Sequence, residues 1–556
     1  MRKSKKTFSI QVKCHQEYDD YANQPPFCWQ IKLPFTRITD ALCDKDEIEE
    51  WESAYPTFID APTGMGKSTF VYKELLPRAA KKGKNVLLLS NRRAVSNQQK
   101  YKVMDEINSR FKETLTEKGV YEQDIFDYVG VITYHRLQGF LNNEENRNWI
   151  ENIEYVVCDE CHFFTSDSLF NSNCDRILKL ITSRFCKAIR VYLTATPWDT
   201  IHRICEAEQE NYLDFRRTCV DAKRPLYLDR RYMLYYHFDR SFDKYDLKFF
   251  EDFSDILPSI NSESDDKWLI FIDNKGTAEK LKNEIKVPIA YLDAESKGVK
   301  VWNELIQNEK FDSKVLLTTS VIDCGVNIID SRLTNIVILS DDRVSIMQMA
   351  GRKRFLNGDK VNLWIQDLPK QKLVSRYLRY IKYQELEYEF DSLVTDKEKQ
   401  NFIYKLWQNE DETVRVLFTV KLHSIIKNRS AFVHITRAIR FYENILSGNT
   451  TFRDEVSRWF GKELVNTNDE LAQFYKNHEY KVLTEEDKED LRLIIAREYK
   501  KQGKTEAQPR RICSLQHTAL NNRLQEARLP YEIQVVNGSW KFVYFGFSDN
   551  KEEQDK

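Results

Sequence analysis

Residues 57 to 356 show short apolar runs that alternate with stretches of helical periodicity. Examples are the runs TFID, NVLLLS, IEYVV and VYLT. Runs this short and this apolar predict strands that are covered on both faces, and the stretches between them predict helices. The alternation favours an α/β fold built on parallel sheets.

This α/β pattern occurs twice along the chain. A second set of runs, KWLIFI, KVLLTT and TNIVIL, follows a less regular connection of aromatic and charged residues over about 200 to 265. We therefore expect two tandem α/β domains, at 36–230 and 231–365, preceded by an N-terminal extension at 1–35.

Beyond residue 365 the pattern becomes mainly helical. Apolar residues recur at helical spacing in KLVSRYLRYIKYQELEYEF and AFVHITRAIRFYENIL, which predicts a helical accessory region at 366–480. The last segment, 481–556, ends in YEIQVVNGSWKFVYF, two β-runs around Asn537-Gly538, which is a strong hairpin signal. A helix followed by a hairpin predicts a winged-helix-like tail.

The predicted tail helix carries a stripe of polar and basic residues. Six of them follow helical spacing along one face: Arg510, Ser514, His517, Asn521, Gln525 and Arg528. Such a face either contacts nucleic acid or is simply solvated, and the pattern leaves both open. Trp540 beyond the turn either stacks on a terminal base pair or belongs to the core of the tail.

Composition narrows the classes of function. The 556 residues include 85 Lys and Arg against 86 Asp and Glu, for a net charge of −1, so a surface for nucleic acid must be a local patch. No run of about 18 apolar residues and no apolar leader occurs, so we expect a soluble cytoplasmic protein without membrane contact. Eleven cysteines at irregular spacing indicate reduced thiols.

One segment, IEYVVCDECHFF, fits three chemistries. Cys158, Cys161 and His162 form the C-x-x-C-H pattern of covalent haem attachment, and they also fit half of a zinc site. This haem attachment is an extracytoplasmic chemistry, and no second ligand pair follows at the spacing that zinc requires. We therefore expect neither haem nor structural zinc. The remaining interpretation is a buried strand that presents Asp159 and Glu160 to a magnesium nucleotide.

The segment APTGMGKST, which follows the run TFID, has the pattern of a phosphate-binding loop. Its glycines let backbone N–H groups curl around phosphates, and the N-terminus of the next helix adds its dipole. Lys67 would reach the β- and γ-phosphates. The residues expected to bind the nucleotide are Thr63, Gly64, Met65, Gly66, Lys67, Ser68 and Thr69.

A phosphate loop needs a magnesium ligand on a neighbouring strand and a base for the attacking water. The Ser68 hydroxyl and Asp159 would hold Mg²⁺, and Glu160 would orient the water. ATP and Mg²⁺ are therefore the expected cofactors.

With these motifs in place, the chain resembles the superfamily 2 helicases, close to their DEAH and flaviviral D-E-x-H branch. Further segments over residues 57 to 356 arrive in the family's order: NVLLLSNRRAVSNQQ, VGVITYHRL, VYLTATPWDT, SKVLLTTSVIDCGVNI and SIMQMAGRKRF. The resemblance implies two RecA-like domains that couple Mg-ATP hydrolysis to movement along nucleic acid or to its unwinding. The winged-helix-like tail favours DNA over RNA.

Two other functions stay open. One is a nucleic-acid-dependent ATPase that grips or remodels its substrate without unwinding it. The other is the motor subunit of a restriction, defence or replication system, which would have a protein partner.

The resemblance also implies roles for individual residues. Contact with nucleic acid is implied for Arg93, Gln98, Thr133, Tyr134, Thr318 and Thr319. Coupling of nucleotide state to strand grip is implied for Thr194, Thr196 and His162, with His162 as a polar contact between the domains. Gly325 would let the backbone approach the nucleotide closely. Asn327 stands where the family often has Asp.

The segment SIMQMAGRKRF departs from the family pattern Q-x-x-G-R-x-G-R. Gln348 would position the water and Arg352 would neutralise charge on the γ-phosphate. The second arginine, Arg354, comes one residue early. Either the loop is shorter and Arg354 still reaches the site, or Lys353 and Arg354 share the role.

The hairpin that separates strands in the DEAH and flaviviral relatives has no counterpart here. Only residues 341–347 lie between the preceding strand and Gln348, which is too short for a wedge hairpin. Strand separation must therefore use another element, or the protein translocates without unwinding.

Overall fold

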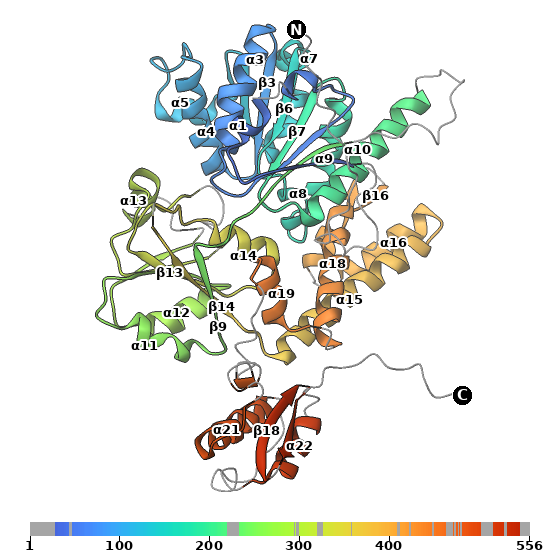
Figure 1. The fold of residues 1–556 in the computed structure, drawn as a ribbon. Helices are drawn as coiled ribbons and strands as arrows, with labels where there is room; N and C mark the ends of the chain where they lie inside the picture. Colours follow the sequence, from blue (N-terminus) through green and yellow to red (C-terminus); the bar gives the residue numbers. More distant parts are fainter. Residues whose placement is uncertain are drawn as a thin grey trace, which may run out of the picture. The chain divides into compact units, whose positions relative to one another are not determined.

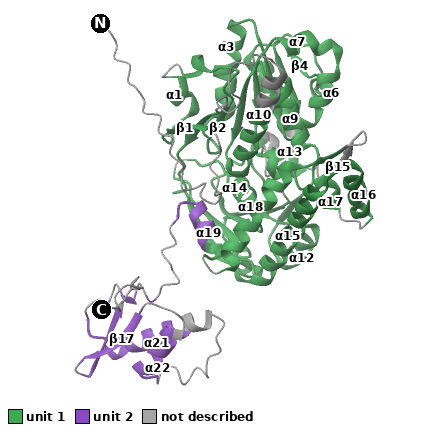
Figure 2. Ribbon diagram, turned by 90° about the vertical axis from the view of Figure 1, so that its right-hand side faces the viewer, with its two compact units in different colours: residues 1–453 green, residues 454–556 purple. Residues whose placement is uncertain are grey.

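In the computed structural model the chain divides into two compact units, 1–453 and 454–556 (Figure 2). The structure describes residues 28–544 except 44–46, 219–232, 294, 296–299, 320–325, 357, 409–411, 422–423, 448–449, 463–470, 472–473, 476–477, 479–480, 502–514, 527–530 and 537. Five residues with predicted roles lie outside the described residues: Gly325, Arg510, Ser514, Arg528 and Asn537.

An eight-stranded sheet forms the centre of the first domain (Figure 1). Its order is β1-β8-β2-β7-β6-β3-β5-β4, and all neighbours are parallel except β4 and β5. The strands are β1 (Cys28–Leu33), β2 (Thr57–Asp60), β3 (Asn85–Ser90), β4 (Ile125–Phe126), β5 (Val129–Thr133), β6 (Ile153–Cys158), β7 (Ile189–Thr194) and β8 (Met233–Phe238). Every residue of β2, β3, β5 and β7 is buried, as the short apolar runs predict.

The limits expected for the first domain need a correction, because the sheet takes in two strands from outside 36–230. β1 lies in the segment expected to be an extension, and β8 lies in the range expected for the second domain. In the structure β1 pairs with β8, and β8 pairs with β2 just before the phosphate loop. A strand joins a sheet by pairing with residues far away in the sequence, which its own apolar pattern does not reveal.

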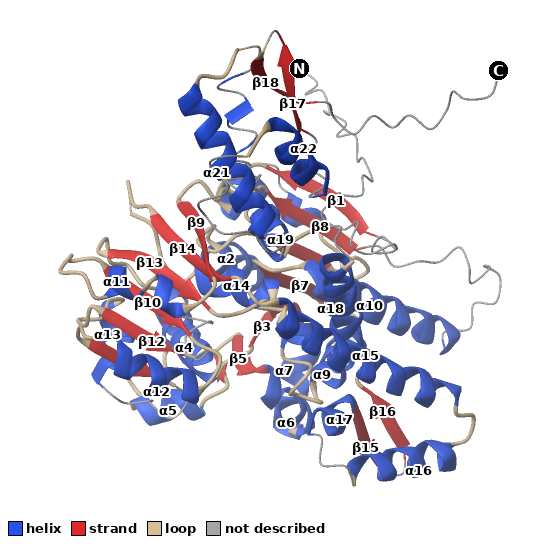
Figure 3. Ribbon diagram, turned by 90° about the horizontal axis from the view of Figure 1, so that it is seen from below, coloured by secondary structure: helices blue, strands red, loops and turns tan. Residues whose placement is uncertain are grey.

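Helices cover both faces of this sheet (Figure 3). Two apolar clusters fill the space beneath them, and neighbouring strand residues such as Leu87 and Leu88 alternate between the two clusters. The helices are α1 (Ile38–Cys43), η2 (Glu47–Glu50), α2 (Lys67–Phe70), η3 (Val71–Leu75), α3 (Leu76–Lys81), α4 (Arg93–Glu106), α5 (Glu117–Glu122), η4 (Tyr134–Arg136), α6 (Leu137–Asn142), η5 (Glu144–Asn146), α7 (Arg147–Glu151), α8 (Phe163–Ser166), α9 (Cys174–Arg184) and α10 (Trp198–Thr218).

The second domain is a six-stranded parallel sheet in the order β11-β12-β10-β13-β14-β9. Its strands are β9 (Tyr245–Phe250), β10 (Lys267–Phe271), β11 (Ile289–Leu292), β12 (Val315–Thr318), β13 (Leu333–Ile338) and β14 (Val361–Gln366). Its helices are η7 (Phe253–Asp255), α11 (Leu257–Ile260), α12 (Lys275–Glu284), α13 (Lys300–Asn308) and α14 (Arg343–Ala350). Only residues 339–342, all described, join β13 to α14, so this connection has no wedge hairpin.

The accessory region is mainly helical, as its periodicity predicts. It comprises α15 (Lys370–Ser392), α16 (Asp396–Trp407), α17 (Glu412–Leu417), α18 (Arg429–Leu446) and a small hairpin that was not predicted, β15 (Phe418–Lys421) and β16 (Ser424–Lys427). α15 packs along α18, where Tyr380 stacks on Tyr442 with ring centroids 6.0 Å apart. Among the described residues, no helix has the length and apolar character needed to cross a membrane.

The unit 454–556 begins within α19 (Phe452–Trp459) and contains α21 (Glu485–Lys501), α22 (His517–Glu526), β17 (Tyr531–Val536) and β18 (Ser539–Tyr544). β17 and β18 form an antiparallel hairpin, so the predicted helix-plus-hairpin tail is present. The side chain of Asn521, a residue of the predicted polar stripe, bonds within its own unit. Its amide donates to Ile533 O at 2.9 Å and accepts from Ile533 N at 2.8 Å, which ties α22 to the hairpin.

Trp540 belongs to the core of this unit. Its side chain is buried among apolar residues that include Leu491 and Phe542, and the cations of Lys488 and Arg492 lie 5.3 and 5.0 Å from its ring. The alternative in which Trp540 stacks on a base pair is therefore wrong, because the ring has no free face to offer.

Candidate active site

The phosphate loop connects β2 to α2 and depends on two glycines with left-handed backbone. Gly64 has φ +90° and Gly66 has φ +84°, a region that residues with a Cβ atom rarely adopt. Gly66 is the N-cap of α2, so the free N–H groups of the first helical turn point toward the loop. Lys67 is buried, and its ammonium donates to Ala61 O at 2.9 Å and to Pro62 O at 3.4 Å.

Ser68 and Asp159 line one small pocket, together with Tyr72 and Gln99. Tyr72 lies in the π-helical turn η3, and such turns are frequent at functional sites. Hydroxyl and carboxylate oxygens are ligands that Mg²⁺ prefers, and substrate phosphates usually complete its shell. The described residues contain no group of three or more His, Cys, Asp or Glu that could hold a metal alone. These donors fit a magnesium nucleotide.

Met65 contributes backbone rather than side chain to the loop. Its side chain is buried in the apolar cluster, and its carbonyl accepts from Ile38 N at 3.2 Å. The hydroxyl-bearing neighbours Ser68 and Thr69 are exposed, and Thr63 is half-buried.

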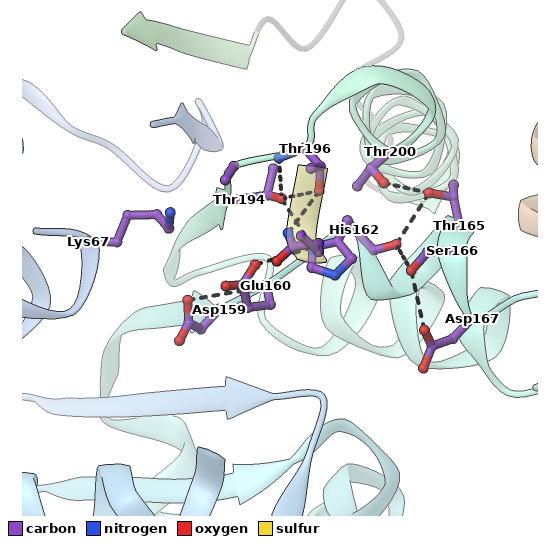
Figure 4. Close-up of polar contacts among 12 residues, drawn as sticks. Lys67, Asp159, Glu160, His162, Thr165, Ser166, Asp167, Thr194, Thr196 and Thr200 are labelled. Carbon is purple, nitrogen blue, oxygen red and sulfur yellow. Dashed lines mark hydrogen bonds and ion pairs between the residues drawn. The ribbon is translucent and has the colours of Figure 1, made fainter. Parts of the chain in front are cut away.

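Asp159 and Glu160 directly follow β6 (Figure 4), and the backbone of Glu160 is unusual. Glu160 has φ +51°, the left-handed region that costs a non-glycine residue roughly 1–2 kcal/mol. Its N–H donates to Asp159 Oδ1 at 3.1 Å. Residues held in such strained conformations cluster at functional sites. Cys158 and Cys161 on either side are fully buried in the apolar core, as expected of ordinary strand neighbours.

The two carboxyl groups have opposite pKa shifts. Burial and the charge of Glu160 raise the pKa of Asp159 to about 7. Burial by itself would also raise the pKa of Glu160, but its hydrogen bond with His162, the charge of His162 and that of Lys67 lower this pKa to about 2. Glu160 is therefore ionised at neutral pH, the state in which a carboxylate accepts a proton.

A series of polar contacts leads from Glu160 to the second domain. Glu160 Oε2 lies 3.2 Å from His162 Nδ1, which lies 3.2 Å from Thr194 Oγ1 (Figure 4). Thr194 Oγ1 lies 3.2 Å from Thr196 Oγ1, and Gln348 Nε2 on α14 donates to Thr196 Oγ1 at 3.3 Å. The expectation that His162 makes the contact between the domains needs a correction. Thr196 makes that contact, and His162 lies behind two hydroxyl groups.

Arg352 and Arg354 enter the same site from the second domain. Arg352 is buried, and it donates to Gln348 O at 2.8 Å and to Gln348 Oε1 at 3.1 Å. Arg354 Nε donates to Asn327 Oδ1 at 2.8 Å, and its Nη1 lies 3.5 Å from the point where a Cβ atom on Gly64 would be. The early position of Arg354 therefore leaves it over the phosphate loop, where Asn327 orients it.

Arg354 keeps its charge beside the phosphate loop, and Gly351 lies close to the same loop. Burial and the charge of Arg352 lower the pKa of Arg354 to about 10, which leaves the guanidinium charged at neutral pH. A Cβ atom on Gly351 would lie 2.7 Å from Thr63 Oγ1, so the end of α14 approaches the loop as closely as only glycine permits.

Lys353, the alternative partner in this role, is directed into its own domain. Its ammonium pairs with Asp359 at 2.8 Å and donates to Asp330 O, and its side chain is fully buried. The interpretation in which Lys353 shares the role of Arg354 is therefore wrong, because these contacts already occupy the ammonium.

The residues predicted to contact nucleic acid fall into two groups. Arg93 is exposed at the start of α4, and Gln98 and Thr319 are half-buried. Thr133 and Thr318 are buried, and Thr318 Oγ1 donates to Thr319 O at 3.0 Å. The buried pair has no side-chain surface for a strand, which contradicts the role expected for it.

Tyr134 is also wrongly predicted as a nucleic-acid contact. Its side chain is fully buried, its ring stacks on Phe163 with centroids 4.7 Å apart, and its hydroxyl donates to Asp159 O at 2.9 Å. Tyr134 supports the acidic pair from inside the domain.

Gln99 is a site residue that the sequence pattern missed. It lies on α4 beside Gln98, and its Nε2 donates to Asp159 Oδ2 at 2.8 Å. Successive residues of a helix point about 100° apart, so only one of the two glutamines faces the acidic pair. The pattern shows two adjacent glutamines and does not show which of them turns inward.

Two protein-family models match the chain, one after the other. The model for the res subunit of type III restriction enzymes matches residues 33–199, and the model for the conserved C-terminal domain of helicases matches residues 249–354. No curated protein matches the chain.

Solved structures with a similar course of the chain include two DEAD-box proteins. The Dbp5 protein of S. cerevisiae, bound to RNA and ADP BeF3, is 16% identical over 56% of this chain and 79% of its own, with a TM-score of 0.39. A DEAD box protein from Methanococcus jannaschii is 15% identical over 60% of this chain and 86% of its own, with a TM-score of 0.33.

The matches to the two family models correspond to the two parallel sheets. The first covers the phosphate loop and the acidic pair, and the second ends at Arg354. Because both models match in the order expected of a two-domain helicase motor, the segment 33–354 is a superfamily 2 helicase motor, which hydrolyses ATP.

Proposed function

We propose that this protein is a motor that moves along DNA, driven by Mg-ATP hydrolysis between its two RecA-like domains. The observation that carries the proposal is the polar series from Glu160 through His162, Thr194 and Thr196 to Gln348. It joins the base of the first domain to the helix of the second that also carries Arg352. We therefore expect a change at either end to act on the other.

Each residue then has a defined task. The N–H groups of the phosphate loop and Lys67 hold the phosphates, and Glu160 accepts the proton of the attacking water. Gln348 positions that water, while Arg352 and Arg354 neutralise the charge that develops on the γ-phosphate. Mg²⁺ on Ser68 and Asp159 would supply a Lewis acid that polarises the phosphoryl oxygens.

The preference for DNA rests on two supports. The tail has the helix and hairpin of a winged-helix-like module, and the first family model is named for a subunit of restriction enzymes. The second support also favours a protein partner within a multi-protein system. We also infer, from the D-E-C-H sequence, that the motor is close to the DEAH branch of superfamily 2.

A second candidate function is remodelling without strand separation. It is favoured by the direct passage from β13 to α14, since these described residues hold no hairpin that could act as a wedge. Such a protein would hydrolyse ATP on DNA and displace bound proteins while leaving the duplex paired.

One set of assays separates these functions. ATP hydrolysis by the full chain is measured with no nucleic acid, single-stranded DNA, duplex DNA and RNA, and strand displacement is measured on forked duplexes. The motor proposal expects DNA to stimulate hydrolysis more than RNA does, with salt-sensitive affinity because phosphate contacts dominate binding. Stimulation by RNA alone would refute the choice of DNA, and strong stimulation without displacement would favour remodelling.

Replacing Gln99 tests the arrangement of the acidic pair. In Gln99→Ala, Asp159 loses the amide that fixes its Oδ2, so the Mg²⁺ concentration for half-maximal hydrolysis should rise about 10-fold, as is typical when a residue that orients a ligand is removed. The measurement is a Mg²⁺ titration at saturating ATP. Gln98→Ala, one position along the same helix, is the control and should leave the Mg²⁺ requirement unchanged. An unchanged requirement in Gln99→Ala would remove Gln99 from the site.

Removing the tail tests its part in DNA binding. A chain that ends near residue 500 would split the apolar cluster that contains Leu491 and Trp540, so the chain is ended after Lys462, which keeps α19 whole. We expect the shorter chain to retain basal ATP hydrolysis and to bind forked DNA about 10-fold more weakly, because a terminal module adds to affinity through effective concentration. Equal fork binding and displacement by both chains would mean that the tail is no DNA element.

A further inference from the structure

Trp198 lies directly after the Thr194-Ala195-Thr196-Pro197 segment, as the first residue of α10, and its ring is buried. Three guanidinium groups from three different segments gather on it. Their Cζ atoms lie 3.9 Å from the ring centroid for Arg343, 5.6 Å for Arg240 and 5.8 Å for Arg437. A cation over an indole is attracted to the ring, but three cations also repel one another unless carboxylates offset them.

Two of these arginines are held by carboxylates of the first domain. Arg240, in the linker between β8 and β9, pairs with the buried Asp60 and donates to Ala195 O at 2.7 Å. Arg437, on α18, pairs with the buried Asp199, the residue next to Trp198. Both arginines therefore contact the indole while they are anchored to carboxylates of the first domain.

Arg343 is different because it comes from the second domain and lies closest to the ring. It is the first residue of α14, the eight-residue helix that also carries Gln348. α14 thus meets the first domain at two points, Arg343 on Trp198 and Gln348 on Thr196. These points are five residues apart, about 7.5 Å along the helix axis, so together they fix how α14 lies in the site.

Helices α15 and α18 of the accessory region contact residues next to Trp198 and residues next to Arg343. On α18, His434 lies 3.5 Å from Asp199, beside Trp198, and Tyr442 donates to Asp341 at 2.6 Å, just before α14. Arg376 on α15 pairs with the same Asp341. The accessory region therefore spans the two motor domains at the point where Arg343 rests on the indole.

We propose that Trp198 is a positioning residue for ATP hydrolysis: its ring, held by Arg437 from the accessory region, seats Arg343 and thereby aligns α14 with Gln348 and Arg352. Trp198 touches neither the nucleotide nor the water in this role and acts through α14. The inference concerns basal ATP turnover, so it stands or falls independently of which nucleic acid the motor uses.

The test is a double-mutant cycle on the full chain with Trp198→Ala, Arg343→Gln and the double variant. Basal kcat, KM for ATP and the melting temperature are measured for each. A misaligned α14 should lower kcat about 10- to 100-fold in each single variant, with KM changed less than about 3-fold. The double variant should lose no more than the larger single loss, because both changes break one contact.

Two conservative variants and one control complete the design. Trp198→Phe keeps a π-face and should recover most of kcat, while Arg437→Gln should lower kcat by a smaller factor and add nothing in the Trp198→Ala background. The control is Lys248→Gln. It removes the cation of the edge strand β9 that lies over Trp364 on the neighbouring strand β14, and it should leave kcat unchanged.

Three results would overturn the proposal. In the first, the loss of kcat in the double variant equals the product of the two single losses. In the second, Trp198→Ala has a normal kcat and a lowered melting temperature, and in the third, Arg343→Gln has a normal kcat. Should Trp198→Ala fail to fold, Arg343→Gln and Trp198→Phe still decide, since neither removes the buried indole volume entirely.

Discussion

Glu160→Gln should bind ATP with near-normal affinity and hydrolyse it at least about 10²-fold more slowly, the loss typical of removing a general base. The amide keeps the shape of the side chain but cannot accept the proton from water. Because the pKa of Glu160 is lowered to about 2, the wild-type carboxylate is ionised throughout the neutral range, and an acidic pH in the assay would not mimic the variant.

The measurement pairs single-turnover hydrolysis with binding of a fluorescent ATP analogue. Glu154→Gln is the matched control: it lies on the same strand, β6, but its carboxylate pairs with Lys82 at the far end, so its hydrolysis should be normal. Lys67→Ala should instead lose nucleotide binding itself. A normal hydrolysis rate in Glu160→Gln would mean that another group serves as the base.

Arg352→Ala should lose about 10³-fold in kcat with a smaller change in ATP affinity, because an arginine finger acts mainly on the transition state. Arg354→Ala should lose turnover too, since its guanidinium lies over Gly64 in the phosphate loop. Rapid-quench kinetics on ATP, with affinity measured separately, distinguish the loss of chemistry from the loss of binding.

Arg332→Ala is a suitable control for both arginine variants. Arg332 lies in the same domain, its side chain is exposed, and its guanidinium makes a long ion pair with Asp330 at 3.6 Å, so its replacement should leave kcat unchanged. Full activity in Arg354→Ala would show that Arg352 alone neutralises the charge on the γ-phosphate and that the shortened loop does not lower kcat.

The parts of the site that the sequence predicted are those fixed by local backbone. The phosphate loop needs glycines at 64 and 66 because of their positive φ, and the acidic pair needs only the end of a buried strand. Requirements of this kind can be recognised in a sequence segment of a few residues. The two parallel sheets are predicted for the same reason, since each strand is a short apolar run.

The predictions that were wrong or incomplete concern contacts with residues far away in the sequence. Tyr134 follows a strand as a nucleic-acid contact would, but its ring stacks on Phe163, which is far along the chain. Gln99 rather than Gln98 faces Asp159 because of how α4 is rotated against the sheet. The apolar pattern of β1 does not say that its neighbour is β8. In each case the sequence predicts the element and packing decides which side chain it presents.

The left-handed backbone of Glu160 has a consequence for how this protein can evolve. Glycine or asparagine would adopt φ +51° with less strain, but neither would supply the carboxylate of Glu160. Relief of this backbone strain favours glycine or asparagine at residue 160, the contacts of Glu160 with His162 and Lys67 oppose that change, and turnover requires glutamate. A variant recovered from a stability screen without an activity requirement should be inactive wherever it carries a substitution at residue 160.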